Sequence, residues 1–365
     1  MIRERVDTGH SRYEILIGTG LLGQTGQLLL ELSVNRSSRH LIVTDEQVRA
    51  AGHLTPLLAS LQAAGYEAEL FVIPAGEASK RLELAERAFE FAYEAGLDRR
   101  SVVLALGGGV VGDFAGFLAA TYMRGIPFVQ LPTTLLAHDS AVGGKVAVNL
   151  SSAKNIIGAF HQPLAVIYDI DALSTLPLRE MRSGYAEAIK HGIIRDAELF
   201  AWIEARTEQI LANDPQVMAE LLARSCRIKA EVVSADEREH GVRAILNFGH
   251  TIGHAVESLA GYGRLRHGEA IAIGMICAAE LSVKMGLCTP DAAEAIASVV
   301  KAAGLPTQIP RDLDADELLS SIKRDKKATG GTLTFVLMRA IGKVEIVKDV
   351  PEKLVRDVIE DRRES

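Results

Sequence analysis

Three of the ten histidines in the chain, His250, His254 and His267, fall in the stretch of residues 243–269. His250 and His254 are four residues apart in an apolar-periodic run, which stacks two imidazoles on one helical face about 5.4 Å apart. His267 follows a glycine-rich turn that can return the chain toward the same point. Neutral imidazole is the commonest protein ligand for zinc, and a catalytic zinc site keeps three protein ligands and an open position. The pattern therefore favours a metal site.

A second segment, residues 184–192, adds a carboxylate to these histidines. Glu187 lies in an apolar helical stretch with Lys190 one turn later. A buried carboxylate needs a partner, and either Lys190 or a divalent cation could supply it; we favour the cation. The pattern differs from that of the zincin metalloproteases, because Thr251 stands where their motif requires a glutamate. A His-x-x-x-His pair alone is more often a feature of a helix surface or core than a metal site.

The elements that must position these residues differ between the two halves of the chain. The first half alternates short β-rich runs with amphipathic helices, which predicts a mostly parallel sheet with ligands at the carboxyl ends of its strands. We expect a helix that Ser79 caps and Gly96 ends. The expected strands are residues 13–17, 40–44, 67–73, 101–106, 128–131 and 165–168.

After residue 171 the periodicity is almost entirely helical. Residues 217–233 are predicted to form one long amphipathic helix, and another begins at Pro290 after a Thr289 cap. A hairpin of residues 332–338 and 343–347 precedes a charged C-terminal helix. The expected fold class is an α/β Rossmann-like N-terminal domain (1–175) with a mostly parallel sheet, followed by a mainly helical domain (176–365).

Composition excludes several classes of protein. With 365 residues, 48% hydrophobic, 24% charged and a net charge of −7, the chain is typical of a soluble globular protein rather than a nucleic-acid or anionic-membrane binder. Residues 270–281 form the longest apolar stretch, which is too short for the ~20 residues of a membrane span. Cys226, Cys277 and Cys288 fit reduced thiols. No targeting segment is visible, and we expect a cytoplasmic protein.

A glycine-rich turn, residues 107–113, matches G-x-G-x-x-G between an apolar strand and a helix. Glycines there let the backbone approach a pyrophosphate, and the helix N-terminus supplies donors. The motif departs from the ordinary Rossmann form, since it follows the fourth expected strand and no acid lies about 20 residues later. Asp45, at the end of the second strand, could hold a ribose instead. Further polar turns lie at residues 75–80, 132–134 and 141–145.

Taken together, the sequence resembles the 3-dehydroquinate synthase family of the shikimate pathway. The resemblance runs nearly end to end and is densest at residues 107–125, 131–149, 184–192, 243–257 and 267–269. It implies a homodimer that uses NAD and Zn²⁺ or Co²⁺. The implied substrate is an anionic sugar phosphate, 3-deoxy-D-arabino-heptulosonate 7-phosphate, which is converted to 3-dehydroquinate and phosphate.

The resemblance also implies roles for individual residues. Glu187, His250 and His267 would be the metal ligands, and His254 a substrate and proton-relay residue. The cofactor residues would be Asp45, Glu77, Lys80, Gly109, Val110, Val111, Gly112, Asp113, Thr133, Thr134, Asp139, Lys145, Lys154, Leu173, Ser174 and Thr175. The other catalytic and substrate residues would be Arg124, Asp139, Lys145, Asn155, Lys190, Lys229, Arg243, Asn247 and Lys326. The loop 150–153 and His161 depart from the family pattern without removing a named side chain.

Three alternatives remain beside this function. A related sugar phosphate cyclase would use the same site on another substrate, but Lys229, Arg243 and Asn247 favour binding of the heptulosonate carboxylate. A metal-dependent polyol dehydrogenase would release NADH stoichiometrically. A catalytically inactive scaffold protein would have no need of an intact trio of metal ligands.

Overall fold

The computed structural model describes residues 1–151, 153–239, 241–261, 263–327 and 333–364. They form two compact units, of which the first comprises Met1–Pro177 and Met218–Arg238 and the second Leu178–Val217 and Glu239–Ser365. Each unit has a hydrophobic core of its own.

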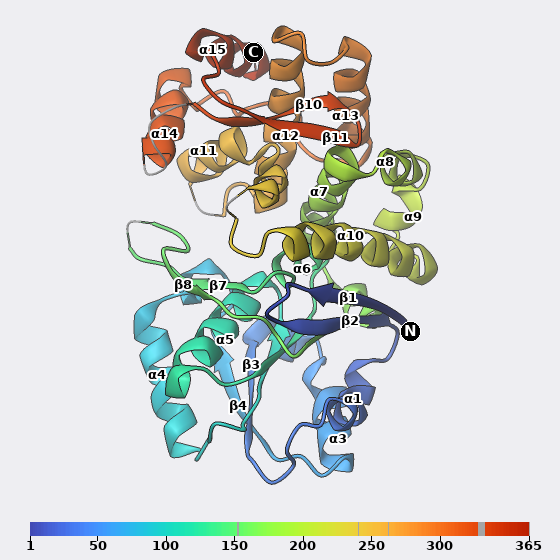
Figure 1. Cartoon of the computed structure of the whole chain (residues 1–365), viewed down its shortest axis with the longest axis vertical. Helices are drawn as coiled ribbons and strands as arrows, with labels where there is room; N and C mark the ends of the chain where they lie inside the picture. Colours follow the sequence, from blue (N-terminus) through green and yellow to red (C-terminus); the bar gives the residue numbers. More distant parts are fainter. Residues whose placement is uncertain (152, 240, 262, 328–332, 365) are drawn as a thin grey trace. The chain divides into compact units, whose positions relative to one another are not determined.

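The first unit is built on a mostly parallel sheet, as the sequence predicts (Figure 1). The strand order is β1-β2-β9-β6-β5-β3-β4, and all neighbouring strands pair in parallel except β1 with β2. The strands are β1 (Ile2–Asp7), β2 (Arg12–Gly18), β3 (His40–Asp45), β4 (Ala68–Ile73), β5 (Val103–Gly107), β6 (Phe128–Pro132) and β9 (Ala165–Asp169). Every residue of β5, β6 and β9 is buried, as expected for strands covered on both faces.

Alternating side chains of the strands divide between two layers of helices. Leu41 and Val43 of β3 pack in the core that includes α4 and α5, whereas Ile42 packs in the core that includes α1 and α3. This alternation follows from the two-residue period of a strand. The helices of this unit are α1 (Thr25–Glu31), α2 (Glu46–Ala50), α3 (Leu54–Ala63), α4 (Leu82–Glu94), α5 (Gly109–Thr121) and α6 (Ala137–Ser140). The N-cap of α4 is Arg81, so the predicted cap at Ser79 is wrong: the Ser79 hydroxyl donates to the Pro74 carbonyl.

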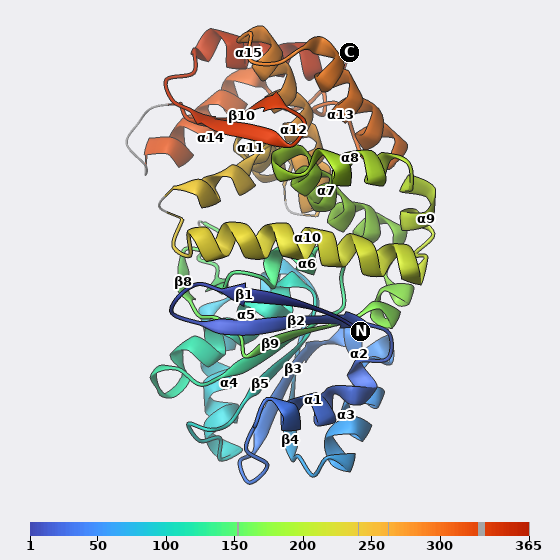
Figure 2. The same ribbon diagram turned by 45° about the vertical axis from the view of Figure 1, so that its right-hand side comes forward.

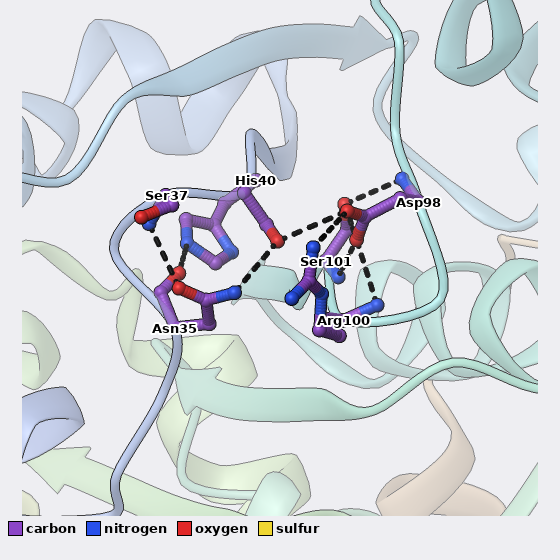
Figure 3. Close-up of polar contacts among 7 residues, drawn as sticks. Asn35, Ser37, His40, Asp98, Arg100 and Ser101 are labelled. Atoms are coloured by element: carbon purple, nitrogen blue, oxygen red, sulfur yellow. Dashed lines mark hydrogen bonds and ion pairs between the residues drawn. The ribbon is translucent and has the colours of Figure 1, made fainter.

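A polar cluster joins the start of β3 to the segment before β5 (Figure 3). The buried His40 ring lies with Nε2 3.0 Å from the Asn35 carbonyl, and its Nδ1 accepts the Val102 amide at 3.0 Å. Asp98 accepts hydrogen bonds from the amides of Arg100 and Ser101 in the same cluster. Because an amide can only donate, Nδ1 of His40 carries no proton and the ring is neutral. Burial lowers the pKa of His40 further below its ordinary value.

The hairpin of β7 (Lys145–Val148) and β8 (Ile157–Phe160) is absent from the sequence-based prediction. It packs on α5 where Gly116 leaves room: a Cβ at Gly116 would lie 2.3 Å from Cγ1 of Val146. The turn before β7 contains Gly143 and Gly144, both with positive φ, as the glycine-rich turn predicted there requires.

The second unit is mainly helical, and its core surrounds α12. Its other helices are α7 (Leu178–Arg195), α8 (Ala197–Glu204), α9 (Thr207–Leu211), α11 (His250–Ala260), α13 (Pro290–Ala302), α14 (Ala315–Lys327) and α15 (Glu352–Arg362), with α12 spanning His267–Lys284. β10 (Phe335–Ala340) and β11 (Lys343–Val347) form the predicted hairpin, although Thr332 of that prediction lies outside the described residues. Pro290 is the first residue of α13 as predicted, but the Thr289 side chain makes no capping hydrogen bond.

The long helix α10 (Pro215–Ala235) differs from the sequence-based division of the chain at residue 175. Its residues from Met218 onward belong to the first unit. Arg227 of α10 pairs with Glu4 of β1 at 2.6 Å, and the Ser234 hydroxyl accepts the Asp7 amide at 3.2 Å. These contacts hold most of α10 on the sheet-bearing unit, although in sequence the helix lies between the two segments of the second unit. Figure 2 shows α10 running alongside β1.

The structure of the described residues bears on two predictions from composition, one about membrane-spanning segments and one about the cysteines. None of the helices in this part of the chain combines the length and the apolar character that crossing a bilayer needs. All three cysteines are free thiols, with Cys226 and Cys277 buried. Burial raises the pKa of the Cys277 thiol to about 12, so this thiol is protonated and unreactive at neutral pH.

Candidate active site

The predicted carboxylate, Glu187, lies in the middle of α7 and is completely buried. Its Oε2 contacts the ammonium of Lys190, which is only 1% exposed. One of the two partners considered from the sequence is therefore present. The other oxygen, Oε1, faces two imidazoles: Nε2 of His250 lies 3.6 Å from it and Nε2 of His267 lies 3.4 Å from it.

The three histidines gather as their spacing predicts. Ligating nitrogens of His250, His254 and His267 all lie within 4.8 Å of one another. The ring centroids of His250 and His254 are 5.1 Å apart, and those of His250 and His267 are 5.6 Å apart. His254 is exposed, whereas His250 and His267 are partly covered. The two histidines that face Glu187 are thus the more enclosed pair.

Close helix packing through glycines sets these positions. A Cβ at Gly268 would lie 2.0 Å from the Ser183 carbonyl oxygen, so α12 approaches α7 backbone to backbone beside His267. A Cβ at Gly274 would lie 2.0 Å from the Gly249 oxygen, so α12 also approaches the residue that precedes His250. A side chain at Gly268 would push α12 away from α7, and one at Gly274 would push α12 away from the start of α11.

Ion pairs fasten the first turns of α7 and α12 to each other. Arg179 of α7 donates from Nε and Nη2 to the two carboxylate oxygens of Glu269, at 2.6 and 2.7 Å. Glu269 also accepts the Arg266 amide at 2.8 Å, and the Arg266 side chain pairs with Glu180 at 2.7 Å. These contacts lie two turns before Glu187 on α7 and two residues after His267 on α12, so they hold the two helices together near both residues.

The second ring nitrogen of each facing histidine has an acceptor. Nδ1 of His250 lies 3.1 Å from the Phe248 carbonyl oxygen. Nδ1 of His267 lies 3.0 Å from Oε2 of Glu257. Both rings therefore present Nε2 to Glu187.

The electrostatic environment differs between the two rings. Burial lowers the pKa of His250 well below its ordinary value, and the Lys190 charge lowers it further. Burial also acts to lower the pKa of His267, but hydrogen bonds to Glu187 and Glu257 outweigh burial and raise that pKa to about 9. The His250 ring is therefore neutral and can ligate a metal through Nε2 without losing a proton. A cation that binds at His267 must first displace the proton from Nε2 of that ring.

This donor set fits a divalent transition metal. A carboxylate oxygen and two imidazole nitrogens from three helices converge within 3.6 Å. Zinc and cobalt take such mixed nitrogen and oxygen ligands, and a three-ligand protein site leaves a position open for a reacting oxygen. The third imidazole, His254, is close enough to reach a group at that position.

The remaining predicted residues of the second unit lie in two places. Arg243 is 1% exposed and lies with Asn247 in a 3₁₀ turn before α11. Nδ2 of Asn247 donates to Glu239 at 2.8 Å, a carboxylate that sequence reasoning missed. Lys326 lies in α14, and its side chain is outside the described part of the structure.

In the first unit, the glycine-rich turn connects β5 directly to α5. A Cβ at Gly108 would lie 2.8 Å from Cγ2 of Thr134, and one at Gly112 would lie 2.7 Å from Oε1 of Gln130. These glycines let the N-terminus of α5 lie against the end of β6 and the turn after it. The first-turn amides of α5, including those of Val110 and Val111, provide the donors expected of an anion site.

A buried lysine links several of the predicted cofactor and substrate residues. Nζ of Lys80 lies 2.6 Å from Oδ2 of Asp113 and 2.5 Å from Oδ1 of Asn155. Glu77, 3.7 Å from Lys80, accepts the Asn149 amide group at 2.8 Å. Burial raises the pKa of Asp113, and the Lys80 charge opposes that rise. The network joins the turn after β4, the first turn of α5 and the loop between β7 and β8.

A second buried pair forms between α6 and α10. Nζ of Lys229 lies 2.9 Å from Oδ1 of Asp139, and the lysine is 7% exposed. Both residues are predicted substrate groups, so α10 brings a residue from late in the sequence to the sheet-bearing unit.

The other predicted residues of this unit lie in turns that follow strands or on exposed segments. Asp45 ends β3 and accepts the Val48 amide at 2.8 Å, so it caps α2. Thr133 and Thr134 follow β6, and Leu173, Ser174 and Thr175 lie in the 3₁₀ segment after β9. Arg124 and Lys145 are exposed, and Lys154 is partly exposed.

Sequence reasoning missed Glu257, Glu269 and Arg179. Glu257 had a usable signal, since it lies seven residues after His250 and two helical turns bring it to the same face. Arg179 and Glu269 had none, because a contact between residues 90 positions apart depends on how α7 and α12 pack.

Known protein families match both parts of the chain. The family described as 3-dehydroquinate synthase N-terminal matches residues 70–183, and 3-dehydroquinate synthase C-terminal matches residues 184–328. The 3-dehydroquinate synthase of Desulforamulus reducens is 50% identical over 349 residues, which cover 95% of this chain and 96% of the relative. The chain belongs to the 3-dehydroquinate synthase family. The resemblance inferred from the motifs is confirmed.

Solved structures of related cyclases share the fold. The structure of 2-deoxy-scyllo-inosose synthase complexed with carbaglucose-6-phosphate, NAD⁺ and Co²⁺ matches with a TM-score of 0.88 and 27% identity, over 99% of this chain and 100% of that one. The 2-epi-5-epi-valiolone synthase from Streptomyces hygroscopicus, with NAD⁺ and Zn²⁺ bound, matches with a TM-score of 0.88 and 29% identity, over 96% of both chains. The predicted fold class is confirmed.

Proposed function

We propose that this chain is a 3-dehydroquinate synthase, a carbon–oxygen lyase that converts 3-deoxy-D-arabino-heptulosonate 7-phosphate to 3-dehydroquinate and phosphate. The reaction proceeds by transient oxidation of a ring hydroxyl, β-elimination of phosphate, re-reduction and intramolecular aldol closure. The observation that carries the proposal is the convergence of Glu187, His250 and His267 in a member of this family.

Glu187, His250 and His267 are the residues that hold the metal ion in this proposal. When bound, Zn²⁺ or Co²⁺ supplies Lewis-acid polarisation of an oxygen undergoing oxidation. Lys190 compensates the buried charge of Glu187, which is a ligand in this proposal. His254 is exposed beside the two facing imidazoles, where it can take up and release a substrate proton.

The cofactor in this proposal is NAD, which supplies reversible hydride transfer when bound. The glycine-rich start of α5 offers backbone amides to its pyrophosphate. Its other expected partners are Asp45, Glu77, Lys80, Asp113, Thr133, Thr134, Asp139, Lys145, Lys154, Leu173, Ser174 and Thr175. Most of them follow strands β3, β4, β5, β6 and β9, the edge where parallel sheets bind ligands.

Basic side chains bind the anionic substrate in an otherwise acidic protein. Arg243 is suited to bidentate contact with a carboxylate or phosphate, whereas Lys190 and Lys229 act as point charges. Burial of these three residues, at 1%, 1% and 7% exposure, strengthens each charge by limiting its screening. Lys145, Asn155, Asn247 and Lys326 are the other substrate residues of the proposal.

The leaving phosphate can act as the base for its own elimination.

We further propose that the enzyme is a cytoplasmic homodimer in which Arg124 reaches the neighbouring subunit's substrate. Arg124 is exposed and has a left-handed backbone conformation with φ of 69°, which projects it from the turn after α5.

The test is a direct assay of the protein loaded with Zn²⁺ or Co²⁺, with NAD⁺ and the heptulosonate phosphate. Release of inorganic phosphate and absorbance of NADH are followed together. Phosphate release without net NADH supports the proposal. Accumulating NADH would support a polyol dehydrogenase, and the absence of both signals would contradict 3-dehydroquinate synthase activity. Phosphate release from glucose 6-phosphate but not from the heptulosonate would instead indicate a related sugar phosphate cyclase.

A further inference from the structure

The ring of His267 lies between two carboxylates. Oε1 of Glu187 is 3.4 Å from Nε2, and Oε2 of Glu257 is 3.0 Å from Nδ1. A carboxylate only accepts hydrogen bonds, so the proton at Nδ1 is donated to Glu257. Nε2 is then the nitrogen that gives up its proton when a cation binds beside Glu187.

His250 provides an internal comparison. Its Nδ1 faces the Phe248 carbonyl at 3.1 Å, which also only accepts, and its Nε2 faces the same Glu187 oxygen at 3.6 Å. Each facing histidine therefore presents Nε2 to Glu187 and Nδ1 to an acceptor, but a neutral carbonyl orients one ring and a carboxylate orients the other. A charged acceptor makes the stronger hydrogen bond and increases the basicity of the opposite nitrogen.

Burial makes the charged acceptor effective. The side chains of Glu257 and His267 are 15% and 31% exposed, so water screens their contact only in part. Glu257 belongs to α11, the helix that begins at His250, and His267 is the first residue of α12. α11 thus carries the candidate ligand His250 at its first residue. Two turns later the same helix carries Glu257, which orients His267 at the start of α12.

From this geometry we propose that Glu257 is a positioning residue of the metal centre: it holds the proton on Nδ1 of His267 and thereby sets the orientation and the metal affinity of Nε2. The inference rests on the proposed function, because it requires that His267 bind the metal. Glu257 is not itself a ligand, since the histidine ring separates it from the Glu187 side of the site.

Two variants separate the charge of Glu257 from its hydrogen bond. Glu257→Gln keeps an accepting oxygen in nearly the same volume but removes the charge, whereas Glu257→Ala removes both. Ser258→Ala, at an exposed position of the same helix, is the matched control. The dissociation constant of Zn²⁺ is measured by competition with a chromophoric chelator, at fixed pH and with each protein intact.

We expect Glu257→Ala to weaken Zn²⁺ binding by about 10–100-fold, the usual effect of losing an outer partner of a metal-bound histidine. Glu257→Gln should weaken it less, within about tenfold, and Ser258→Ala should bind as the wild type does. If Glu257 only filled space, Glu257→Gln would bind Zn²⁺ as tightly as the wild type, because the two side chains have nearly the same volume.

A spectroscopic signature gives a second readout. In Zn²⁺-loaded wild-type protein with ¹⁵N-labelled histidine, the His267 ring should show a protonated Nδ1 and a metal-bound Nε2. In Glu257→Ala the Nδ1 resonance should shift toward that of a water-exposed ring. Wild-type affinity in both Glu257 variants, or an unchanged His267 spectrum, would overturn the inference while leaving the proposed function intact. Failure of the wild type itself to bind Zn²⁺ would contradict the proposed function as well.

Discussion

At the scale of single residues, the two histidines on α11 have different surroundings although they share a helical face. His250 faces Glu187 through Nε2 at 3.6 Å and is oriented by a backbone carbonyl. His254 is exposed, and its ring lies edge-on to that of His250. This difference in exposure and partners supports the proposed roles, metal binding for His250 and proton transfer for His254.

Substitution of each histidine by alanine tests this assignment. We expect His250→Ala to lose tightly bound metal together with turnover, because a ligand is removed. His254→Ala should retain the metal while its turnover falls by about 10²–10⁴-fold, the usual contribution of an acid–base group. Metal content after exhaustive dialysis and turnover under saturating substrate are the measurements. Equal loss of metal from both variants would reverse the two roles.

At the scale of elements, backbone contact between helices determines where the ligands lie. Gly268 lets α12 approach α7, since any Cβ there would lie 2.0 Å from the Ser183 oxygen. Arg179 and Glu269 then join the same two helices at their first turns.

Introduction of a single methyl group should therefore disrupt this packing. Gly268→Ala should lower the free energy of unfolding by about 1–3 kcal/mol or more, because the opposing atom is backbone and cannot rotate away. The helix propensity of alanine offsets at most about 1 kcal/mol of that cost. Metal affinity should fall as well, since His267 is adjacent. Gly23→Ala is the control, since nothing lies within 4 Å of a Cβ there. Urea unfolding and metal titration of both variants provide the comparison; equal stability would contradict the packing argument.

The His40 cluster predicts a dependence of stability on pH. Nδ1 of His40 accepts the Val102 amide, so protonation of the ring breaks the link between β3 and the segment before β5. The folded-state pKa is lowered, so this contribution is fully present above the unfolded value of about 6.5 and is lost as pH falls toward the folded-state pKa.

The difference in unfolding free energy between wild type and His40→Gln measures this contribution. It should be largest near pH 7.5 and shrink by up to about 1.4 kcal/mol per pH unit between about pH 6.5 and the folded-state pKa. Chemical denaturation at a series of pH values gives the comparison, and subtraction of the variant removes the contributions of other histidines. A difference that does not change with pH would show that folding leaves the pKa of His40 unchanged, which would contradict the prediction.

At the scale of the whole molecule, the candidate ligands for metal and cofactor are divided between the two units. Glu187, His250 and His267 all belong to the second unit, whereas the glycine-rich turn of α5 belongs to the first. Binding stabilises the region that makes the contacts by RT ln(1 + [L]/Kd), or about 2.7 kcal/mol at a hundredfold excess over Kd.

Hydrogen exchange should report this division. Zn²⁺ alone should slow amide exchange in peptides from α7, α11 and α12, and NAD⁺ alone should slow it in peptides from the turns after β3 and β5. Mass spectrometry of peptic fragments from the apo protein and from each singly loaded protein resolves the two patterns. Uniform protection of both units by Zn²⁺ alone would contradict the assignment of all three ligands to one unit.

The sequence predicts the parallel sheet, the helical second unit and the gathering of the three histidines, because each depends on local periodicity or spacing. It does not predict β1, because the consecutive charged residues Arg3, Glu4 and Arg5 hide the apolar alternation of a strand. This strand is stabilised by its pairing with β2, which the sequence alone does not show. It also misplaces most of α10, because an amphipathic pattern shows that a face is buried but not which unit covers it.

The candidate site shows the same limit. Glu187 is recognisable as a buried carboxylate from its apolar neighbours, but its simultaneous contact with Lys190 and two imidazoles depends on three helices. The partners that orient and fasten those helices, such as Glu257 and Arg179, are ordinary surface charges in the sequence. Their roles come from tertiary packing.

The order of the three ligands along the chain has a consequence for biosynthesis. Glu187 is made first, His250 much later, and His267 opens the helix α12 that must then pack against both earlier helices. A ribosome-bound nascent chain that ends before α12 lacks one donor and the packing that orients the others. Capture of an ion by all three candidate ligands therefore requires a nascent chain that extends at least through α12.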